Sequence, residues 1–420
     1  MTLPPTLQHH GWTESMRRWI GLAGWPSVFA SLTSLATLIG LSLLLRELPA
    51  SEAGSLALLL SLSDILSLLA LLGGGTVITR LYAAAGPGVF DWRRDLAQTA
   101  AYAAPLVALC TMGLALLYGF IPSSALYLLT VTFLATLLAA ASAMLNSQGH
   151  HASAAVLLRA PNAFLLVPGL LALFYRPEIS LLVVLLAHLT ATAFSLFIAT
   201  MVLLRTLPIG PQGISRSQRL SGMAFLASSV TDLLPEQGLI AVAGRILPLN
   251  QVAAFAAVAV LTRPFRLLRN VLAMILAPDL VRFRRSSYRR LLAGIWGLAL
   301  ACGLAAAILV PPIATQFYGA RYQEAMTWIP YLSLAGVLLI AVVPPRADLG
   351  VRAPIRFVNR FALTYFLAMM GSLTLTVLGM QLWGAVFLGI AVVLLQLTET
   401  GVAYTFWLGF RQSEKRSATE

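Results

Sequence analysis

Hydrophobic positions are grouped along the chain into long apolar runs, and short polar segments separate these runs. An α-helix needs about 20 apolar residues to cross a bilayer, so each run predicts one membrane span. The pattern therefore predicts an all-α polytopic membrane protein with 12 transmembrane helices. The predicted spans cover residues 22–46, 55–80, 97–119, 123–146, 153–175, 179–204, 219–244, 251–277, 290–315, 326–345, 360–380 and 383–409.

The composition strengthens this prediction. Of the 420 residues, 59% are hydrophobic and 10% are charged, whereas a soluble domain averages about 45–50% apolar and about 25% charged residues. This balance excludes a soluble enzyme and a disordered chain. The sequence has no glycine-rich loop followed by Lys and Ser or Thr, so we expect no ATP hydrolysis. No cofactor and no metal site is predicted.

The basic residues predict the orientation in the membrane. If the N-terminus is cytoplasmic and the spans alternate, 21 of the 28 Lys and Arg residues fall in cytoplasmic segments and three fall inside the eighth span. The outer segments then carry Arg46, Arg176, Arg245 and Arg321. Cytoplasmic loops of membrane proteins are enriched in Lys and Arg, so both termini are predicted to be cytoplasmic. The net charge of +13 is thereby explained by topology, and nucleic acid is not an expected partner.

Sequence landmarks recur in the two halves of the chain at a nearly constant spacing. The matched pairs are 46–52 with 245–251, 92–97 with 288–293, 118–119 with 318–319, and Asn162 with Asn359. Such recurrence predicts two parallel six-helix repeats with a site between them. The predicted parts are an N-terminal tail (1–21), an N-lobe (22–207), an inter-lobe linker (208–218), a C-lobe (219–410) and a C-terminal tail (411–420).

Several ionisable residues lie inside predicted spans, where they are costly and usually face a bundle interior or water. Arg263, Arg266 and Arg269 are spaced three apart in the eighth span. Asp232 and Glu236 are four apart in the seventh span, hence on one helix face, and Pro235 between them predicts a kink. The remaining members are Asp64 in the second span, His188 in the sixth and Glu399 in the twelfth.

Guanidinium groups pair well with phosphate oxygens, so these arginines predict a site for an anionic headgroup. The predicted headgroup residues are Arg263, Arg266 and Arg269 in the cavity, with Arg46 and Arg245 at its outer mouth. The acids Asp64, Asp232, Glu236 and Glu399 are predicted to balance these charges or to carry a coupling ion, H+ or Na+. The alternative is that the group consists of buried ion pairs that only fix helix packing. Arg269 snorkelling to the interface and Arg46 and Arg245 as ordinary anchors also stay open.

The residues of segment 44–54, followed by those of 60–62, 72–74 and 79–80, resemble the opening of the polysaccharide biosynthesis/export proteins. These are O-antigen-flippase-like members of the multidrug/oligosaccharidyl-lipid/polysaccharide (MOP) exporter superfamily. Later segments that resemble the same family are 244–247, 252–255, 276–278 and 317–319. The resemblance implies a V-shaped transporter of two lobes in a bacterial inner membrane, with a cavity lined by the first, second, seventh and eighth spans.

The resemblance also implies a function. We expect a flippase, and not an enzyme, that moves a polyprenyl-diphosphate-linked oligosaccharide to the outer leaflet for polysaccharide biosynthesis. Alternating access would be coupled to an ion or to the membrane potential, and polysaccharide synthesis machinery is an expected partner. The nearest alternative is a cation-coupled multidrug exporter of the same superfamily. A membrane polysaccharide polymerase or acyltransferase is a more distant alternative, because the predicted outer loops are short and hold no His/Asp/Glu cluster.

Overall fold

The computed structural model describes residues 12–175, 179–215, 218–219, 223–280 and 285–417, and these residues are almost entirely helical. The predicted tails and the inter-lobe linker therefore lie partly outside the described residues. The first lobe contains α1 (Trp12–Glu47), α2 (Ala50–Ala70), α3 (Gly74–Ala85), α4 (Trp92–Tyr118), α5 (Pro122–Ser147), α6 (His151–Ala163), α7 (Leu166–Tyr175) and α8 (Leu181–Thr206).

The second lobe begins with α10 (Met223–Leu233), which continues through the π-helical segment η2 (Leu234–Gly238) into α11 (Leu239–Ile246). The later elements are α12 (Leu249–Leu261), α13 (Pro264–Leu280), α14 (Arg285–Tyr318), the 3-10 segment η3 (Gly319–Trp328), α15 (Ile329–Ala341), α16 (Val343–Arg352), α17 (Ile355–Trp383), the short 3-10 turn η4 (Gly384–Val386) and α18 (Phe387–Ser417). We call these two groups of helices the N-lobe and the C-lobe.

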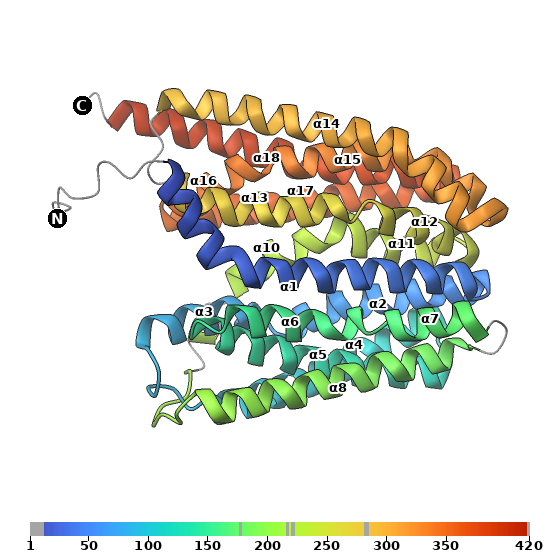
Figure 1. The fold of residues 1–420 in the computed structure, drawn as a ribbon, viewed down its shortest axis with the longest axis horizontal. Helices are drawn as coiled ribbons and strands as arrows, with labels where there is room; N and C mark the ends of the chain where they lie inside the picture. The colour runs from blue at the N-terminus through green and yellow to red at the C-terminus, as the bar shows by residue number, and fades with distance from the viewer. Residues whose placement is uncertain (1–11, 176–178, 216–217, 220–222, 281–284, 418–420) are drawn as a thin grey trace.

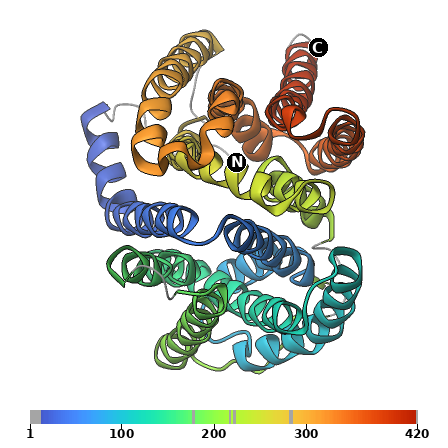
Figure 2. The same ribbon diagram turned by 90° about the vertical axis from the view of Figure 1, so that its right-hand side faces the viewer.

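The helices of both lobes run along the long axis of the molecule (Figure 1). The beginning of α1 and the end of α18 lie at the same end, which we call the terminal end, and α3 and α16 also lie there. The opposite end, which we call the far end, holds α7, α11 and α12. Seen from the far end, the N-lobe and the C-lobe form two halves, and α2 of the N-lobe packs against α12 of the C-lobe (Figure 2).

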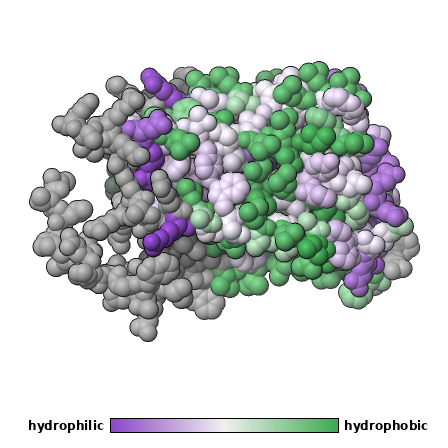
Figure 3. Space-filling model, turned by 90° about the horizontal axis from the view of Figure 1, so that it is seen from above, coloured by the Kyte–Doolittle hydropathy of each residue, from purple (hydrophilic) through white to green (hydrophobic). Residues whose placement is uncertain are grey.

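Within the described residues, 7 helical stretches are long and apolar enough to cross a membrane. The number rises to 8 if α12 and α13, which meet at an angle of 46°, form one broken span. Apolar side chains also form a belt around the middle of the molecular face in Figure 3, with hydrophilic side chains at both ends. The protein is therefore a multi-pass membrane protein, and the layout of twelve spans stays a prediction.

Five predicted spans are interrupted by backbone breaks, and three of these breaks bear on the site described below. The predicted span 55–80 is wrong as one continuous helix, because α2 ends and α3 begins around Leu72 and Gly73, both with positive φ (51° and 70°). Pro235 produces the π-helical turn η2 in place of a simple kink, since proline has no N–H to donate. Pro264 begins α13 after the break that follows α12, which leaves Arg263 in the break itself.

The two lobes touch closely at the far end. Gly54 of α2 faces the backbone of α12 so closely that a Cβ atom there would lie 2.0 Å from the carbonyl oxygen of Leu249. Only glycine permits this approach. The Tyr118 hydroxyl of the N-lobe donates to the Ala241 carbonyl of α11 at 2.8 Å. These contacts close the far end between the lobes.

A second group of far-end contacts caps α1. The Tyr322 hydroxyl donates to the Leu45 carbonyl at 2.8 Å, and the Arg321 guanidinium donates to the carbonyls of Arg46 and Leu48. The last carbonyls of a helix have no partner within the helix and attract cations. A C-lobe segment thus satisfies the end of an N-lobe helix, and this end cap must break if the lobes separate there.

The described part of the inter-lobe linker is fastened to the N-lobe at the terminal end. The carboxylate of Asp95, which is fully buried, accepts from the backbone N–H of Ile214 at 2.8 Å and from Tyr82 at 2.8 Å. Arg219 forms an ion pair with the same carboxylate at 3.0 Å. Ile214 and Arg219 are therefore both held against the N-lobe through one buried carboxylate.

Candidate functional site

Charged side chains gather in the C-lobe, where η2 and the break before α13 interrupt two neighbouring helices. They come from α10, η2, α13, α16 and α18, and they form two adjacent groups of ion pairs. The broken helices matter because each break changes the direction in which the flanking side chains point. Residues of the seventh and eighth predicted spans are thereby brought together.

The first group surrounds Arg346 of α16. Its Nη1 lies 2.6 Å from Asp232 Oδ1 and 2.6 Å from Glu399 Oε1, and its Nη2 lies 3.1 Å from Asp232 Oδ2. Arg269 Nη2 also reaches Glu399 Oε1 at 3.0 Å and Asp232 Oδ1 at 3.8 Å. The ring of Tyr365 lies beneath the Arg346 guanidinium, 5.5 Å from it. Two guanidinium groups and two carboxylates thus compensate one another.

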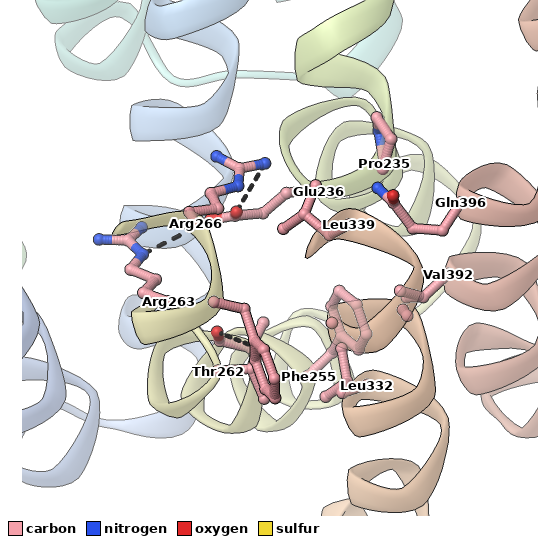
Figure 4. Close-up of a pocket in the computed structure, with 14 residues that line it drawn as sticks. Pro235, Glu236, Phe255, Thr262, Arg263, Arg266, Leu332, Leu339, Val392 and Gln396 are labelled. Atoms are coloured by element: carbon pink, nitrogen blue, oxygen red, sulfur yellow. Dashed lines mark hydrogen bonds and ion pairs between the residues drawn. The ribbon is translucent and has the colours of Figure 1, made fainter. Parts of the chain in front are cut away.

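The second group surrounds Glu236 of η2 (Figure 4). Its Oε2 lies 2.7 Å from Arg266 Nη2, and its Oε1 lies 3.5 Å from Arg263 Nε. Glu236 and both arginines line a small pocket of about 60 Å³, whose other walls are largely apolar. The expectation that acids of the seventh span hold these arginines is met by Glu236, whereas Asp232 contacts Arg346 and Arg269.

Asp64 connects this region to the N-lobe. Its Oδ2 accepts from the Gln237 side-chain amide at 3.2 Å, and Ser61 donates to the oxygen of the same amide at 2.8 Å. Asp64 and Arg263 line a common cavity of about 30 Å³ at the boundary between the lobes. Asp64 and Arg263 therefore face one cavity, and the hydrogen bond that joins Asp64 to the C-lobe comes from Gln237.

A larger cleft of about 490 Å³ lies against the first group. Its polar lining is Asp232, Arg266, Arg269, Asn270 and Arg346. The elements that carry these residues, α10, α13 and α16, all lie toward the terminal end (Figure 1). The lining itself carries three guanidinium groups and one carboxylate, and the two other acids that pair with these arginines, Glu236 and Glu399, lie outside it. Such a set fits a ligand that presents several anionic oxygens, because guanidinium binds them in pairs.

The predicted outer pair lies at the far end, away from this cleft. Arg46 contacts its neighbour Glu47 at 3.1 Å and lies over the Phe317 ring, 5.3 Å from its centre. Arg245 is in the last turn of α11 and is exposed. Their role as an exit pair therefore stays a prediction, while Arg269 is held by acids instead of pointing to an interface.

Sequence reasoning missed Arg346 and Gln237. Arg346 follows an apolar run and two prolines, and it counts as a cytoplasmic loop residue when the tenth span is ended at 345. In the structure the helix continues as α16 to Arg352, which places Arg346 beside Asp232. The position of Arg346 directly after the predicted span 326–345 could have indicated it as a site residue, because a residue at the end of a span still lies close to membrane depth. Gln237 carries no charge and gave no signal.

His188, the ionisable residue of the sixth predicted span, lies apart from this site within the N-lobe. Its Nδ1 is 2.8 Å from the Tyr127 hydroxyl, and its Nε2 is 3.1 Å from the side-chain oxygen of Asn162. Both ring nitrogens therefore have partners within the N-lobe.

No family model matches the sequence, and no curated protein matches it by sequence. Solved structures nevertheless share its fold. An inward-facing multidrug resistance MATE family transporter of the MOP superfamily has 14% identity and a TM-score of 0.64, over 91% of this chain and 94% of that one. The lipid II flippase MurJ in an inward closed conformation has 10% identity and a TM-score of 0.64, over 90% and 86%. An outward-facing MATE transporter of this superfamily has 14% identity and a TM-score of 0.56, over 94% and 97%.

Proposed function

We propose that this protein is a MOP-superfamily transporter that flips a polyprenyl-diphosphate-linked oligosaccharide across a bacterial inner membrane by alternating access. The observation that carries the proposal is the cleft of about 490 Å³ with Arg266, Arg269 and Arg346 in its wall. A diphosphate presents several oxygens and at least two negative charges, which three guanidinium groups can bind together. The shared fold with both MATE transporters and a lipid II flippase supports the superfamily.

In this proposal the described conformation is the inward-facing state. The basic residues assigned to cytoplasmic segments, 20 without Arg346, favour a cytoplasmic terminal end. The cleft lies toward that end, while Tyr118, Arg321 and Tyr322 join the lobes at the far end. The lipid-linked headgroup would therefore enter from the cytoplasmic leaflet and leave after the far-end contacts open.

Twelve spans in two parallel repeats are part of the same proposal. Five pairs of successive helices are separated by a short break and can each form one span: α2 with α3, α6 with α7, α10 with α11, α12 with α13 and α15 with α16. The seven other helices supply the rest. Pro49 before α2 and Pro248 before α12 have nearly the same backbone angles, with ψ 144° at both, which supports the repeat offset of 199.

The test is flipping of a fluorescently labelled polyprenyl-diphosphate disaccharide in proteoliposomes, measured by quenching of the outer-leaflet dye. We expect transport by the wild type and a loss of at least tenfold in Arg266→Ala. Arg360→Ala is the matched control, because Arg360 is exposed on α17 and should leave transport unchanged. Equal transport by the wild type and empty liposomes would refute the proposal.

A cation-coupled multidrug exporter is the second candidate function. The observation that favours it is the set of four acids at membrane depth, Asp64, Asp232, Glu236 and Glu399, together with the fold shared with MATE transporters. Uptake of ethidium driven by an H+ or Na+ gradient, in the same proteoliposomes, separates the two. Gradient-driven ethidium movement without lipid flipping would establish the exporter.

A further inference from the structure

The proposed function leaves the position of Glu236 unexplained: it lines the pocket of about 60 Å³ and the cavity of about 30 Å³, but not the large cleft. The π-helical turn η2 places its carboxylate in the small pocket, 2.7 Å from the guanidinium of Arg266. The Glu236 side chain is 15% exposed and that of Arg266 is 30% exposed. The pair is thus largely shielded, which strengthens its attraction relative to a surface pair, yet water and a ligand can still reach the arginine.

Arg266 belongs to both cavities. It lines the small pocket with Glu236 and also lines the large cleft with Arg269 and Arg346. A ligand anion in the cleft therefore has access to a guanidinium that a carboxylate already holds from the other side. Carboxylate and phosphate oxygens accept from the same guanidinium N–H donors, and Glu236 already engages Nη2 of Arg266, so a phosphate that needs this donor competes with the carboxylate.

We propose that Glu236 is an intramolecular competitor of the substrate: it holds Arg263 and Arg266 in the empty site and returns to them to expel the bound diphosphate. This inference rests on the proposed function, because it presumes an anionic substrate in the cleft. It assigns Glu236 to the control of affinity and release. Asp64, Asp232 and Glu399 are not part of this switch.

The other carboxylates are less suited to this role. Arg346 contacts two acids, Asp232 and Glu399, and Arg269 contacts the same two, so each guanidinium keeps one partner when the other is displaced. Within the described residues, Glu236 is the one carboxylate at ion-pair distance from Arg263 and Arg266. Displacing this single side chain therefore frees two guanidinium groups at once.

The pocket also offers a place for the displaced carboxylate. Its volume of about 60 Å³ leaves room for a side chain to change rotamer, and Gln396 of α18 is part of the lining. The Gln396 side chain points toward the region of Pro235 and Glu236 in Figure 4. Its amide N–H groups can donate to a carboxylate that has left Arg266. The pocket lining thus includes a hydrogen-bond donor for the displaced carboxylate.

Removal of the Glu236 charge should therefore raise the affinity for an anion and slow its transport. If the Glu236 charge is removed, nothing in the protein competes for Arg266, so an anion binds more tightly. The same change removes the group that returns to the arginines and expels the anion, so release becomes slower. A purely structural role of the pair predicts otherwise, because a weakened site would lose affinity and transport together.

The experiment compares Glu236→Gln with the wild type in nanodiscs, using farnesyl diphosphate as the probe. Farnesol and inorganic diphosphate serve as separate arms that distinguish the lipid from the anionic part. We expect the dissociation constant of farnesyl diphosphate to fall about tenfold in Glu236→Gln, a change of about 1.4 kcal/mol. Flipping of the labelled polyprenyl-diphosphate disaccharide should fall at least fivefold. Glu324→Gln, an exposed residue in η3, is the matched control and should change neither.

The outcomes separate this inference from the proposed function. If the wild type does not bind farnesyl diphosphate and Arg266→Ala leaves flipping of the labelled lipid unchanged, both the inference and the proposed function are overturned. Binding that Arg266→Ala weakens, but that Glu236→Gln leaves unchanged or weakens, overturns the competitor role alone. Tighter binding in Glu236→Gln combined with undiminished flipping also overturns it, because the carboxylate would then play no part in release.

Discussion

Removal of Arg346 tests whether the first charged group is held together by compensation of charge. In Arg346→Met, Asp232 and Glu399 lose their shortest contacts, both at 2.6 Å. Arg269 remains, at 3.0 Å from Glu399 and 3.8 Å from Asp232. Asp232 and Glu399 then share the single guanidinium of Arg269, and the two negative charges repel each other.

The expected cost follows from the burial of the two acids. Glu399 is 1% exposed and has an oxygen without a hydrogen-bond partner, whereas Asp232 is 36% exposed and can be solvated. Breaking a buried ion pair by removing one partner costs about 3–5 kcal/mol. Because Arg269 still contacts Glu399 and Asp232 reaches water, we expect a loss near the lower end of this range, about 3 kcal/mol.

The assay is the free energy of unfolding in detergent, measured by denaturant titration, with the apparent Tm as a second readout. The double variant Arg346→Met/Glu399→Gln removes the buried charge as well and should recover about 2 kcal/mol of the loss. Arg360→Met on the exposed face of α17 is the control and should change stability by less than about 0.5 kcal/mol. Strictly additive losses in the double variant would refute the compensation argument, since the two groups would then not interact.

Three further predictions concern the far end and the linker. Arg321→Ala removes the cap that the C-lobe places on the end of α1. In this variant we expect the probe Ser55→Cys to react faster with a water-soluble maleimide than it does with Arg321 present, and an unchanged rate would contradict the cap as a contact between the lobes. Gly54→Leu forces a side chain into the Leu249 carbonyl and should lower the yield of folded protein by more than Gly113→Leu, a glycine with open space around it; equal yields would contradict the close approach. Asp95→Asn removes the charge that holds Arg219 and should increase proteolytic cleavage of the linker at least severalfold, whereas unchanged cleavage would show that the backbone contacts suffice.

Sequence reasoning located the charged residues but not all of their partners. The prediction that acids within the spans balance the arginines agrees with the contacts of Glu236 with Arg263 and Arg266. Asp232, which lies before η2, contacts Arg346 and Arg269 and not the arginines that Glu236 contacts, since the π-helical segment between the two acids departs from the α-helical period. Periodicity predicts faces only while the helix stays regular.

The helix breaks were predictable in part. Proline at 235 and at 264 marks two of them, since each removes a backbone donor. The break at Leu72 was not predictable from residue type alone, because a leucine with φ of 51° is costly and is adopted only where the surrounding packing imposes it. The three glycines that follow permit this turn, but the same glycines would fit close helix packing equally well. Tertiary context decided between the two.

Arg346 brings the charges of the site into balance. The charged set at membrane depth now contains four arginines and four acids: Arg263, Arg266, Arg269, Arg346, Asp64, Asp232, Glu236 and Glu399. A set that is neutral overall costs less to hold in the bilayer than a cationic one. It also means that a bound diphosphate makes the loaded site negative by the full charge of the ligand. An inside-negative potential then favours outward movement of that charge by about 2.3 kcal/mol per elementary charge at 100 mV, if the charge crosses the whole field. In the proposed flippase, the balanced empty site would thus return without moving net charge, and the loaded site would be the one that the potential drives outward.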